Sequence, residues 1–387
     1  MHDQSIVFSI VLIFAGAAVF ATVALYLRQA MLVAYLALGV VLGPWVTGLV
    51  SDAELIQEMA RIGIIFLLFL LGLNLIPAKL LQLLKATTLV TLFSTLIFAG
   101  FAIGVASAFG FRGNDLTLIG ICAAFSSTII GLKLLPTTVL HHRHTGEVII
   151  SVLLLQDLLA ILAMLLIQGG GELPLIDAGL KILALPVVIA LAWAGQRYIL
   201  LPLLVRFDRI QEYVFLLAIG WCLGIAQLAH TVGLSHESGA FIAGIVLASS
   251  PISLHIAESL KPLRDFFLVL FFFALGAGID PSALSQIWLP ALLIGVGLLA
   301  IKPVVFRFLL VRQSESNKLG WETGVRLGQM SEFSLLIVFV AVQNQFASTD
   351  AVYLVQFATI LSFVISTYWI VMKYPTPIAV DESLRRD

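Results

Sequence analysis

The stretch VIISVLLLQDLLAILAMLLI, residues 148–167, decides the class of this protein. It is long and apolar enough to cross a membrane as a helix, because about 20 apolar residues span the hydrocarbon core. Gln156 and Asp157 interrupt it near its middle, with eight residues before the pair and ten after it. An ionisable side chain at that depth costs about 2.5 kcal/mol or more and marks a functional site by default. Asp157 is therefore the first candidate for the chemistry of this protein.

The composition extends this interpretation to the whole chain. Of the 387 residues, 60% are hydrophobic and 11% are charged, whereas soluble domains carry roughly 25% charged residues. The net charge of −1 gives no indication of a nucleic-acid partner. Cys122 and Cys222 both lie inside apolar segments, so we expect buried thiols and no disulfide. The first apolar run, residues 6–26, is too long for a signal peptide and follows no basic segment, so it counts as the first span.

The apolar runs predict an all-α polytopic membrane protein with about thirteen transmembrane helices. Short connections leave no room for a soluble domain, so residues 1–373 form one transmembrane domain and residues 374–387 a short tail. The predicted spans are approximately 5–26, 30–50, 60–76, 86–109, 115–138, 147–167, 179–201, 211–229, 235–250, 265–280, 287–310, 321–343 and 350–372.

The distribution of basic residues predicts the orientation, because lysine and arginine favour cytoplasmic loops. With the N-terminus outside and the C-terminus in the cytoplasm, 16 of the 21 basic residues fall in inside segments. Arg61, Arg112 and Lys181 fall outside, and Lys302 and Arg326 lie within spans. We therefore expect an integral protein of a prokaryotic inner membrane in that orientation.

Two halves of the chain resemble each other. The segment FLLGLNLIP at 69–77 is similar to FALGAGIDP at 273–281, and GVVL at 39–42 is similar to GIVL at 244–247. The offsets of 204 and 205 residues shift the pattern by seven predicted spans, and an odd shift inverts the second copy relative to the first. Inverted repeats with a site near the bilayer midplane are typical of secondary transporters.

The repeat also relates two polar clusters inside apolar spans. Offset by 204 residues, Ser127 falls on Ser331. Hydroxyl groups can replace helical hydrogen bonds, and an unwound stretch frees carbonyl groups to face an ion. We therefore predict that two broken helices cross near the midplane, although packed Ser/Thr helix contacts are the alternative. The residues of the two clusters are Ser126, Ser127 and Thr128 in the first, and Gln329, Ser331 and Glu332 in the second.

Lys302 lies too deep in its span for its side chain to reach the interface easily. We expect it to compensate charge near the crossing, with a purely structural role as an equal alternative. Glu332 can pair with Lys302 or Arg326, or lie at the inner mouth of the pathway. His141, His142 and His144 lie in an inside loop, where a solvated loop is favoured over a pH sensor.

In this order and spacing, the motifs resemble the membrane domain of the monovalent cation:proton antiporter-2 family, over nearly the whole chain. The family contains Kef-type potassium/proton and NapA-type sodium/proton antiporters. The resemblance implies a NapA-like fold with a scaffold that forms a homodimer, a mobile core and elevator-like alternating access. The motifs are the cluster at 126–128, Gln156-Asp157, GAFIAG at 239–244, PLRDFF at 262–267 with FFF at 271–273, Lys302 and QMSEF at 329–333.

The resemblance also implies the roles of individual residues. The ion and proton site would comprise Asp157, Gln156, Ser126, Ser127 and Thr128, with Lys302, Gln329, Ser331 and Glu332 in support. The core bundles would cover residues 86–167 and 287–372. NapA-like members carry two aspartates where this chain has Gln156-Asp157, and the Gln-Asp form is Kef-like and favours potassium. Kef-like proteins usually add a C-terminal nucleotide-binding regulatory domain, which would be a separate subunit or missing here, so glutathione control is in doubt.

A lone buried carboxylate is sufficient for exchange, because a proton and a cation compete for it. With neutral Gln156, one proton exchanges for one K⁺ and no net charge moves. The prediction is a K⁺/H⁺ antiporter that is not an enzyme and needs no cofactor. Na⁺/H⁺ exchange, an ion-coupled solute symporter, a cation channel and a nonconducting sensor subunit remain alternatives.

Overall fold

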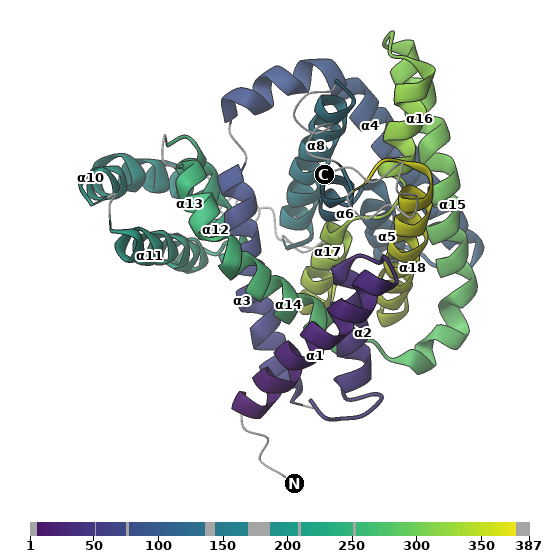
Figure 1. The fold of residues 1–387 in the computed structure, drawn as a ribbon, viewed down its shortest axis with the longest axis horizontal. Coiled ribbons are helices and arrows are strands. Elements are labelled where there is room, and N and C mark those ends of the chain that lie inside the picture. The colour runs from purple at the N-terminus through teal and green to yellow at the C-terminus, as the bar shows by residue number, and fades with distance from the viewer. Residues whose placement is uncertain are drawn as a thin grey trace.

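The computed structural model describes residues 6–50, 52–74, 77–135, 144–168, 186–207, 210–250 and 253–376. Within these ranges the chain forms helices and no strand element (Figure 1). The elements are α1 (Ile6–Tyr26), α2 (Met31–Leu42), α3 (Ala53–Asn74), α4 (Pro77–Ala108), α5 (Asn114–Ala124), α6 (Thr128–Lys133), α8 (His144–Gln168), a run from Pro186 that includes η1 (Gln196–Leu200) and α10 (Leu201–Arg206), α11 (Gln211–Thr231), α12 (His236–Ala248), α13 (Ser253–Ser259), α14 (Lys261–Ala277), η2 (Pro281–Ala283), α15 (Leu284–Arg312), α16 (Asn317–Arg326), α17 (Glu332–Gln343) and α18 (Thr349–Lys373).

Seven helices in the described ranges are long and apolar enough to cross a membrane. They are α1, the C-terminal part of α4, α8, the run Pro186–Arg206, α11, the run Pro281–Arg312 and α18. Four shorter apolar helices, α2, α5, α12 and α17, fall within other predicted spans. An integral membrane protein built from α-helices is therefore confirmed, whereas the number thirteen stays a prediction.

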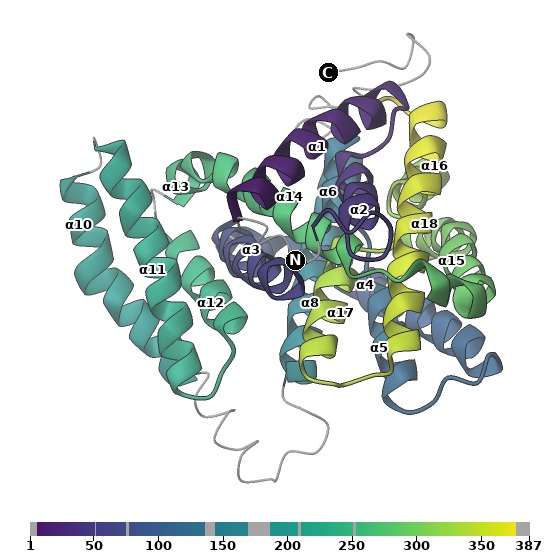
Figure 2. The same cartoon turned by 90° about the horizontal axis from the view of Figure 1, so that it is seen from below.

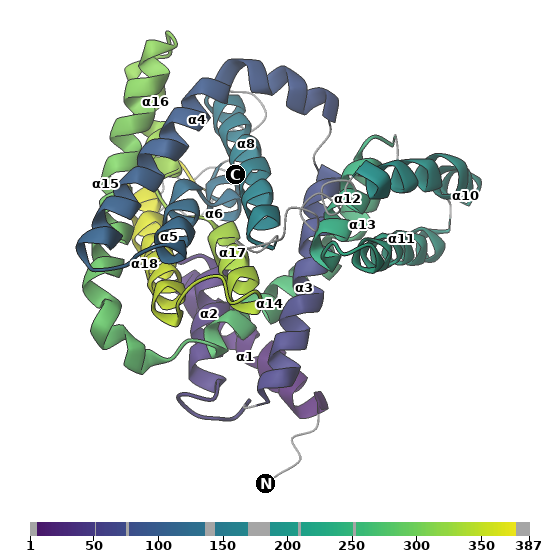
Figure 3. The same ribbon diagram turned by 180° about the vertical axis from the view of Figure 1, so that it is seen from behind.

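The helices form two packed groups. In one group, α15 packs on α4, α16 and α18, while α17 packs on α5, α8 and α18. In the other, α3 packs on α12 and α14, α2 packs on α14, and α11 packs on α12. Figure 2 and Figure 3 show α10 and α11 on the far side of α3 and α12 from the first group. The first group contains the two predicted core bundles, and α18 also contacts α2 of the second group.

Glycines fix two close helix crossings that the repeat relates to each other. Gly39 of α2 meets Gly276 of α14, and Gly244 of α12 meets Gly72 of α3. A Cβ atom on any of the four would overlap a backbone carbonyl oxygen of the facing helix, so only glycine permits this approach. The sequence offsets pair Gly39 with Gly244 and Gly72 with Gly276, so one crossing is the counterpart of the other. These contacts support the internal repeat.

Candidate functional site

Asp157 lies in the middle of α8, inside the first helix group, and its side chain is 1% exposed. The hydroxyl group of Thr128 lies 2.9 and 3.0 Å from the two carboxylate oxygens. A hydroxyl has one proton, so it donates to one oxygen at a time or shares the proton between them. Among the described residues no lysine or arginine forms an ion pair with Asp157. The carboxyl group is therefore buried with a neutral donor and, in the part of the chain that the structure describes, without a fixed counter-charge.

Gln156 is fully buried beside Asp157, and its orientation is fixed by a backbone group. The side-chain oxygen of Gln156 accepts a hydrogen bond of 3.1 Å from the backbone N–H of Ser126. If the amide group were flipped, its NH2 would face the N–H of Ser126, and two donors cannot form a hydrogen bond. The side-chain nitrogen of Gln156 must therefore point away from Ser126. That nitrogen has no hydrogen-bond partner among the described residues. The predicted role of Gln156 as an ion ligand therefore depends on the remaining lone pair of its oxygen.

The first predicted break is present, shifted by one residue. Helix α5 ends at Ala124, Phe125 has extended backbone angles, and α6 begins at Thr128. The sequence predicted the unwound residues as 126–128, but Thr128 is already helical because the Ser127 hydroxyl caps α6 by accepting a 3.1 Å bond from the N–H of Ile130. Thr128 is the first residue of α6, and its hydroxyl is the one that meets Asp157.

The second predicted break has the same construction. Helix α16 ends at Arg326 and α17 begins at Glu332, so residues 327–331 are non-helical where the sequence predicted 329–332. The hydroxyl of Ser331 caps α17 by accepting a 3.0 Å hydrogen bond from the N–H of Phe333. Ser331 is the repeat counterpart of Ser127, and each serine caps the helix that follows its break.

The two breaks contact each other directly. The hydroxyl of Ser126 donates to the carbonyl of Leu327 over 2.8 Å, and the side-chain amide of Gln329 donates to the carbonyl of Ser127 over 3.4 Å. The ammonium group of Lys302 donates to the carbonyls of Phe125 and Gln329, each over 2.8 Å. It thus joins one residue from each break.

Lys302 is fully buried; its ammonium group also donates to the Ser126 hydroxyl over 3.1 Å and lies 5.2 Å from the centre of the Phe98 ring. The lysine comes from α15, which continues as a helix through Pro303. Phe125 directly follows the last residue of α5, and the C-terminal end of a helix carries partial negative charge. Lys302 therefore lies at the crossing, and its role there stays a prediction.

Glu332 opens α17 and is 6% exposed. Its carboxyl group lies near that of Asp157. Arg326 pairs with Glu322 over 3.0 Å and donates to the carbonyls of Leu134 and Pro375. The arginine thereby ties the ends of α6, α16 and α18 together, as expected for a structural role.

Hydroxyl groups of α18 also reach the second break, and none of them was among the predicted site residues. The Ser366 hydroxyl donates to the side-chain oxygen of Gln329 over 2.8 Å. The backbone N–H of Met330 donates to the hydroxyl of Ser362 over 3.0 Å. The signal was available, because Thr359, Ser362 and Ser366 recur at helical spacing in an otherwise apolar span.

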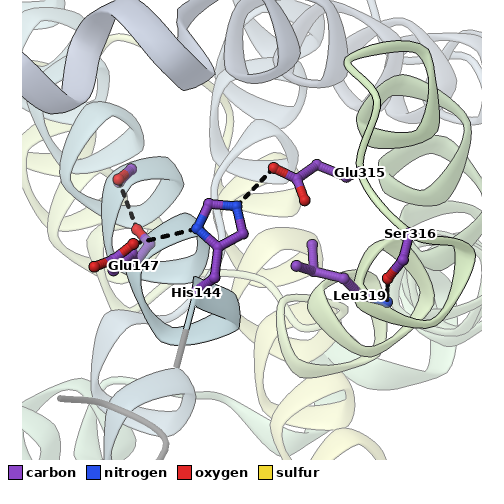
Figure 4. A network of polar contacts seen from close by, with 6 residues as sticks. His144, Glu147, Glu315, Ser316 and Leu319 are labelled. Atoms are coloured by element: carbon purple, nitrogen blue, oxygen red, sulfur yellow. Dashed lines mark hydrogen bonds and ion pairs between the residues drawn. The ribbon is translucent and has the colours of Figure 1, made fainter. Parts of the chain in front are cut away.

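A separate polar cluster lies at the start of α8 (Figure 4). The imidazole of His144 meets Glu315 over 2.8 Å and Glu147 over 3.2 Å, each through a different ring nitrogen. The side chain of His144 is 61% exposed and precedes the predicted span 147–167. Glu315 first, and then Glu147, raises the pKa of His144, because only the protonated ring donates to both carboxylates. His141 and His142 lie outside the described residues.

Comparison with known proteins matches a family model of the transmembrane part of sodium/hydrogen exchangers to residues 10–373. The chain is 34% identical over 338 residues to the glutathione-regulated potassium-efflux system protein KefC of Klebsiella pneumoniae, a match that covers 84% of this chain and 54% of KefC. It is 28% identical over 352 residues to the iron transporter MagA of Paramagnetospirillum magneticum, covering 89% of this chain and 80% of MagA. The chain thus spans about half the length of the KefC relatives that it matches.

A solved structure shares the fold. The sodium proton antiporter MjNhaP1 from Methanocaldococcus jannaschii, at pH 8, superposes with a TM-score of 0.70. The match covers 94% of this chain and 95% of that chain, at 18% sequence identity. At this identity the similarity establishes a common architecture and leaves the transported ion open.

Proposed function

Because this chain belongs to the sodium/hydrogen exchanger family of transmembrane proteins, we propose that it exchanges a monovalent cation for protons at Asp157. The observation that carries the proposal is the carboxyl group of Asp157, which is buried in the membrane domain without a basic partner among the described residues. A bare carboxylate is costly there. A bound proton or a bound cation removes that cost, and the two exclude each other.

The surroundings of Asp157 support this competition. Thr128 supplies a hydroxyl oxygen beside the carboxylate, and it directly follows the first break. Lys302 occupies three of the neighbouring acceptors, so its positive charge stabilises the crossing while leaving the carboxylate to the transported ion. A cation at this site would complete its coordination with neutral oxygens.

K⁺ is the preferred cation in this proposal, and Na⁺ is the alternative. The neutral amide of Gln156 beside a single carboxylate suits a weakly hydrated ion, whereas Na⁺ usually requires a tighter and more charged site. The potassium-efflux name of the KefC relatives supports K⁺. The structural relative is a sodium proton antiporter, which keeps Na⁺ open.

Exchange through one carboxylate and a neutral glutamine moves no net charge. Glu332 could change the number of protons exchanged per cation, because it lies near Asp157 and carries a second titratable carboxyl group. If Glu332 keeps its protonation state through the cycle, one proton exchanges for one cation. Electroneutral exchange is therefore part of the proposal, and its test is the dependence of flux on membrane potential.

Alternating access requires the site to face each side in turn, and we propose an elevator-like movement. The first helix group carries all the candidate site residues, and the second group is the scaffold against which it would move. Loading Asp157 neutralises the charge that opposes crossing of the apolar barrier. Cross-links between cysteines engineered in α2 and α18, which contact each other across the two groups, should stop transport, and cross-links between α15 and α18 should not. Full transport with α2–α18 cross-links would favour a fixed site with gates.

The scaffold would also form a homodimer. Gly220 and Gly224 lie four residues apart on an exposed face of α11, where a Cβ atom would meet no described atom. Small residues at this spacing permit close helix contact in membranes. We further propose a bacterial plasma-membrane location with the N-terminus outside. Because the match covers only 54% of KefC, a nucleotide-binding regulatory domain, in the same or a separate chain, belongs to this proposal.

Flux in proteoliposomes tests the proposed function. A proton gradient should drive counterflow of K⁺, and Na⁺, Rb⁺, Li⁺ and Fe²⁺ complete the series, the last because MagA carries the name of an iron transporter. Antiport gives cation-dependent proton movement without current. A channel would give current without a proton gradient, and a symporter would require a third solute. Absence of cation-driven proton movement with every ion would refute the proposal.

A further inference from the structure

Helix α18 provides none of the proposed ion ligands, yet it places hydroxyl groups against the second break. Ser366 is 1% exposed, and its hydroxyl donates to the side-chain oxygen of Gln329 over 2.8 Å. Gln329 is fully buried, so each hydrogen bond of its amide group is made with protein atoms or lost.

The partners of Gln329 define which way its amide points. Its amide nitrogen donates to the carbonyl of Arg326 over 3.0 Å and to the carbonyl of Ser127 over 3.4 Å. Carbonyl groups accept only, so the nitrogen must face them and the oxygen must face Ser366. The hydroxyl of Ser366 therefore supplies the donor that completes this arrangement.

Gln329 is also one of the residues that hold the two breaks together. Its side chain reaches Ser127, the residue that caps α6 and precedes Thr128. Its backbone carbonyl accepts from Lys302 over 2.8 Å. A change in the position of Gln329 thus reaches both the lysine and the start of α6, where the Thr128 hydroxyl meets Asp157.

We propose that Ser366 is a positioning residue for the cation site, acting through the side-chain amide of Gln329. This inference rests on the proposed function, since it assigns α18 a part in cation affinity. Without the Ser366 hydroxyl, the buried oxygen of Gln329 loses its donor. The amide can then rotate or shift, and the contacts that Gln329 makes with Ser127 and Lys302 become looser.

Helix α18 offers a matched control in the next residue. The hydroxyl of Thr367 is buried and has no hydrogen-bond partner among the described residues. Thr367→Val removes that hydroxyl at constant shape, so it reports the effect of altering the packing of α18 alone. Ser366→Cys retains a weaker donor than the hydroxyl.

The test compares these variants in proteoliposomes. Ser366→Ala should raise the KM for K⁺ about fivefold or more, because a buried acceptor is left unpaired, while the maximal rate per folded protein changes less. Ser366→Cys should fall between wild type and Ser366→Ala, and Thr367→Val should resemble wild type. An unchanged KM in Ser366→Ala and Ser366→Cys, or an equal rise in Thr367→Val, would overturn the proposal. If Ser366→Ala does not fold, a raised KM in Ser366→Cys supports it and an unchanged KM overturns it.

Hydrogen–deuterium exchange separates this inference from the proposed function. Exchange at the backbone amides of residues 327–331 should quicken in Ser366→Ala and stay at the wild-type rate in Thr367→Val. If the wild-type protein exchanges no cation, the proposed function fails, while quicker amide exchange still identifies Ser366 as the residue that holds the break. Unchanged amide exchange together with an unchanged KM means that Ser366 positions nothing.

Discussion

The hydroxyl of Thr128 should set the affinity of the site for its cation. Thr128→Val keeps the shape of the side chain and removes the only donor that the described residues direct at Asp157. Towards an ionised carboxylate such a hydrogen bond contributes about 1.5–3 kcal/mol, and towards a neutral carboxylic acid about 0.5–1.5 kcal/mol. The difference, about 1–1.5 kcal/mol, favours the ionised form that binds the cation. Its loss should weaken cation binding about fivefold to tenfold.

The assay is the KM for K⁺ in proteoliposomes, measured at two pH values. Because protons compete with the cation, the rise in KM should be larger at the lower pH. Thr323→Val is the matched control, since the Thr323 hydroxyl on α16 is buried without a hydrogen-bond partner among the described residues. A KM for Thr128→Val within twofold of wild type, or the same rise in Thr323→Val, would refute the reasoning.

Three further outcomes are expected. Gly244→Ala should lower the stability by about 1–3 kcal/mol because its Cβ overlaps the backbone of α3, whereas Gly100→Ala on the open face of α4 should raise it by about 0.5–1 kcal/mol; equal melting temperatures would contradict this. His144→Gln should lower the free energy of unfolding by less than about 1 kcal/mol below pH about 6.5. This deficit should vanish as the pH rises through the raised pKa of His144, so a melting-temperature deficit that is the same at pH 6 and pH 9 would count against the prediction. Gln156→Asp should raise the affinity for Na⁺ or Li⁺ relative to K⁺ and make flux sensitive to membrane potential; an unchanged ion series and no such sensitivity would argue against it.

Composition and hydrophobic periodicity were sufficient to predict the fold class and the internal repeat. Apolar runs predicted an all-α membrane protein, and the 204-residue offset related Gly72 to Gly276 before any contact was known. The sequence could not predict that Gly276 faces Gly39, because a repeat relates equivalent positions and does not say which helices pack together. The number of membrane spans also stays a prediction, since length and hydropathy do not distinguish spanning helices from shorter buried ones.

The sequence predicted which residues lie at the site better than it predicted their hydrogen-bond partners. Depth and polarity singled out Asp157, Lys302 and the two serine clusters, and the structure brings them together. The ends of the breaks were wrong by one or two residues, because capping by Ser127 and Ser331 starts each second helix. The cap positions depend on local backbone angles, which apolar periodicity does not encode.

The supporting residues were missed for a different reason. A serine inside an apolar helix is a weak signal for a site, since buried hydroxyls commonly bond to their own helix. Thr359 does so, donating to the carbonyl of Val355 over 2.7 Å. Only the position of Gln329 shows that Ser366 has a partner on another helix.

Proton-coupled cation flux in reconstituted Asp157→Asn tests the central claim most directly. The amide keeps the size of the side chain and loses the group that a proton and a cation share, so exchange should fall to the level of empty liposomes. Asp350→Asn, in the exposed first turn of α18, is the control and should transport like wild type. Both proteins should be monodisperse and melt as the wild type does. Exchange retained in folded Asp157→Asn would contradict the account.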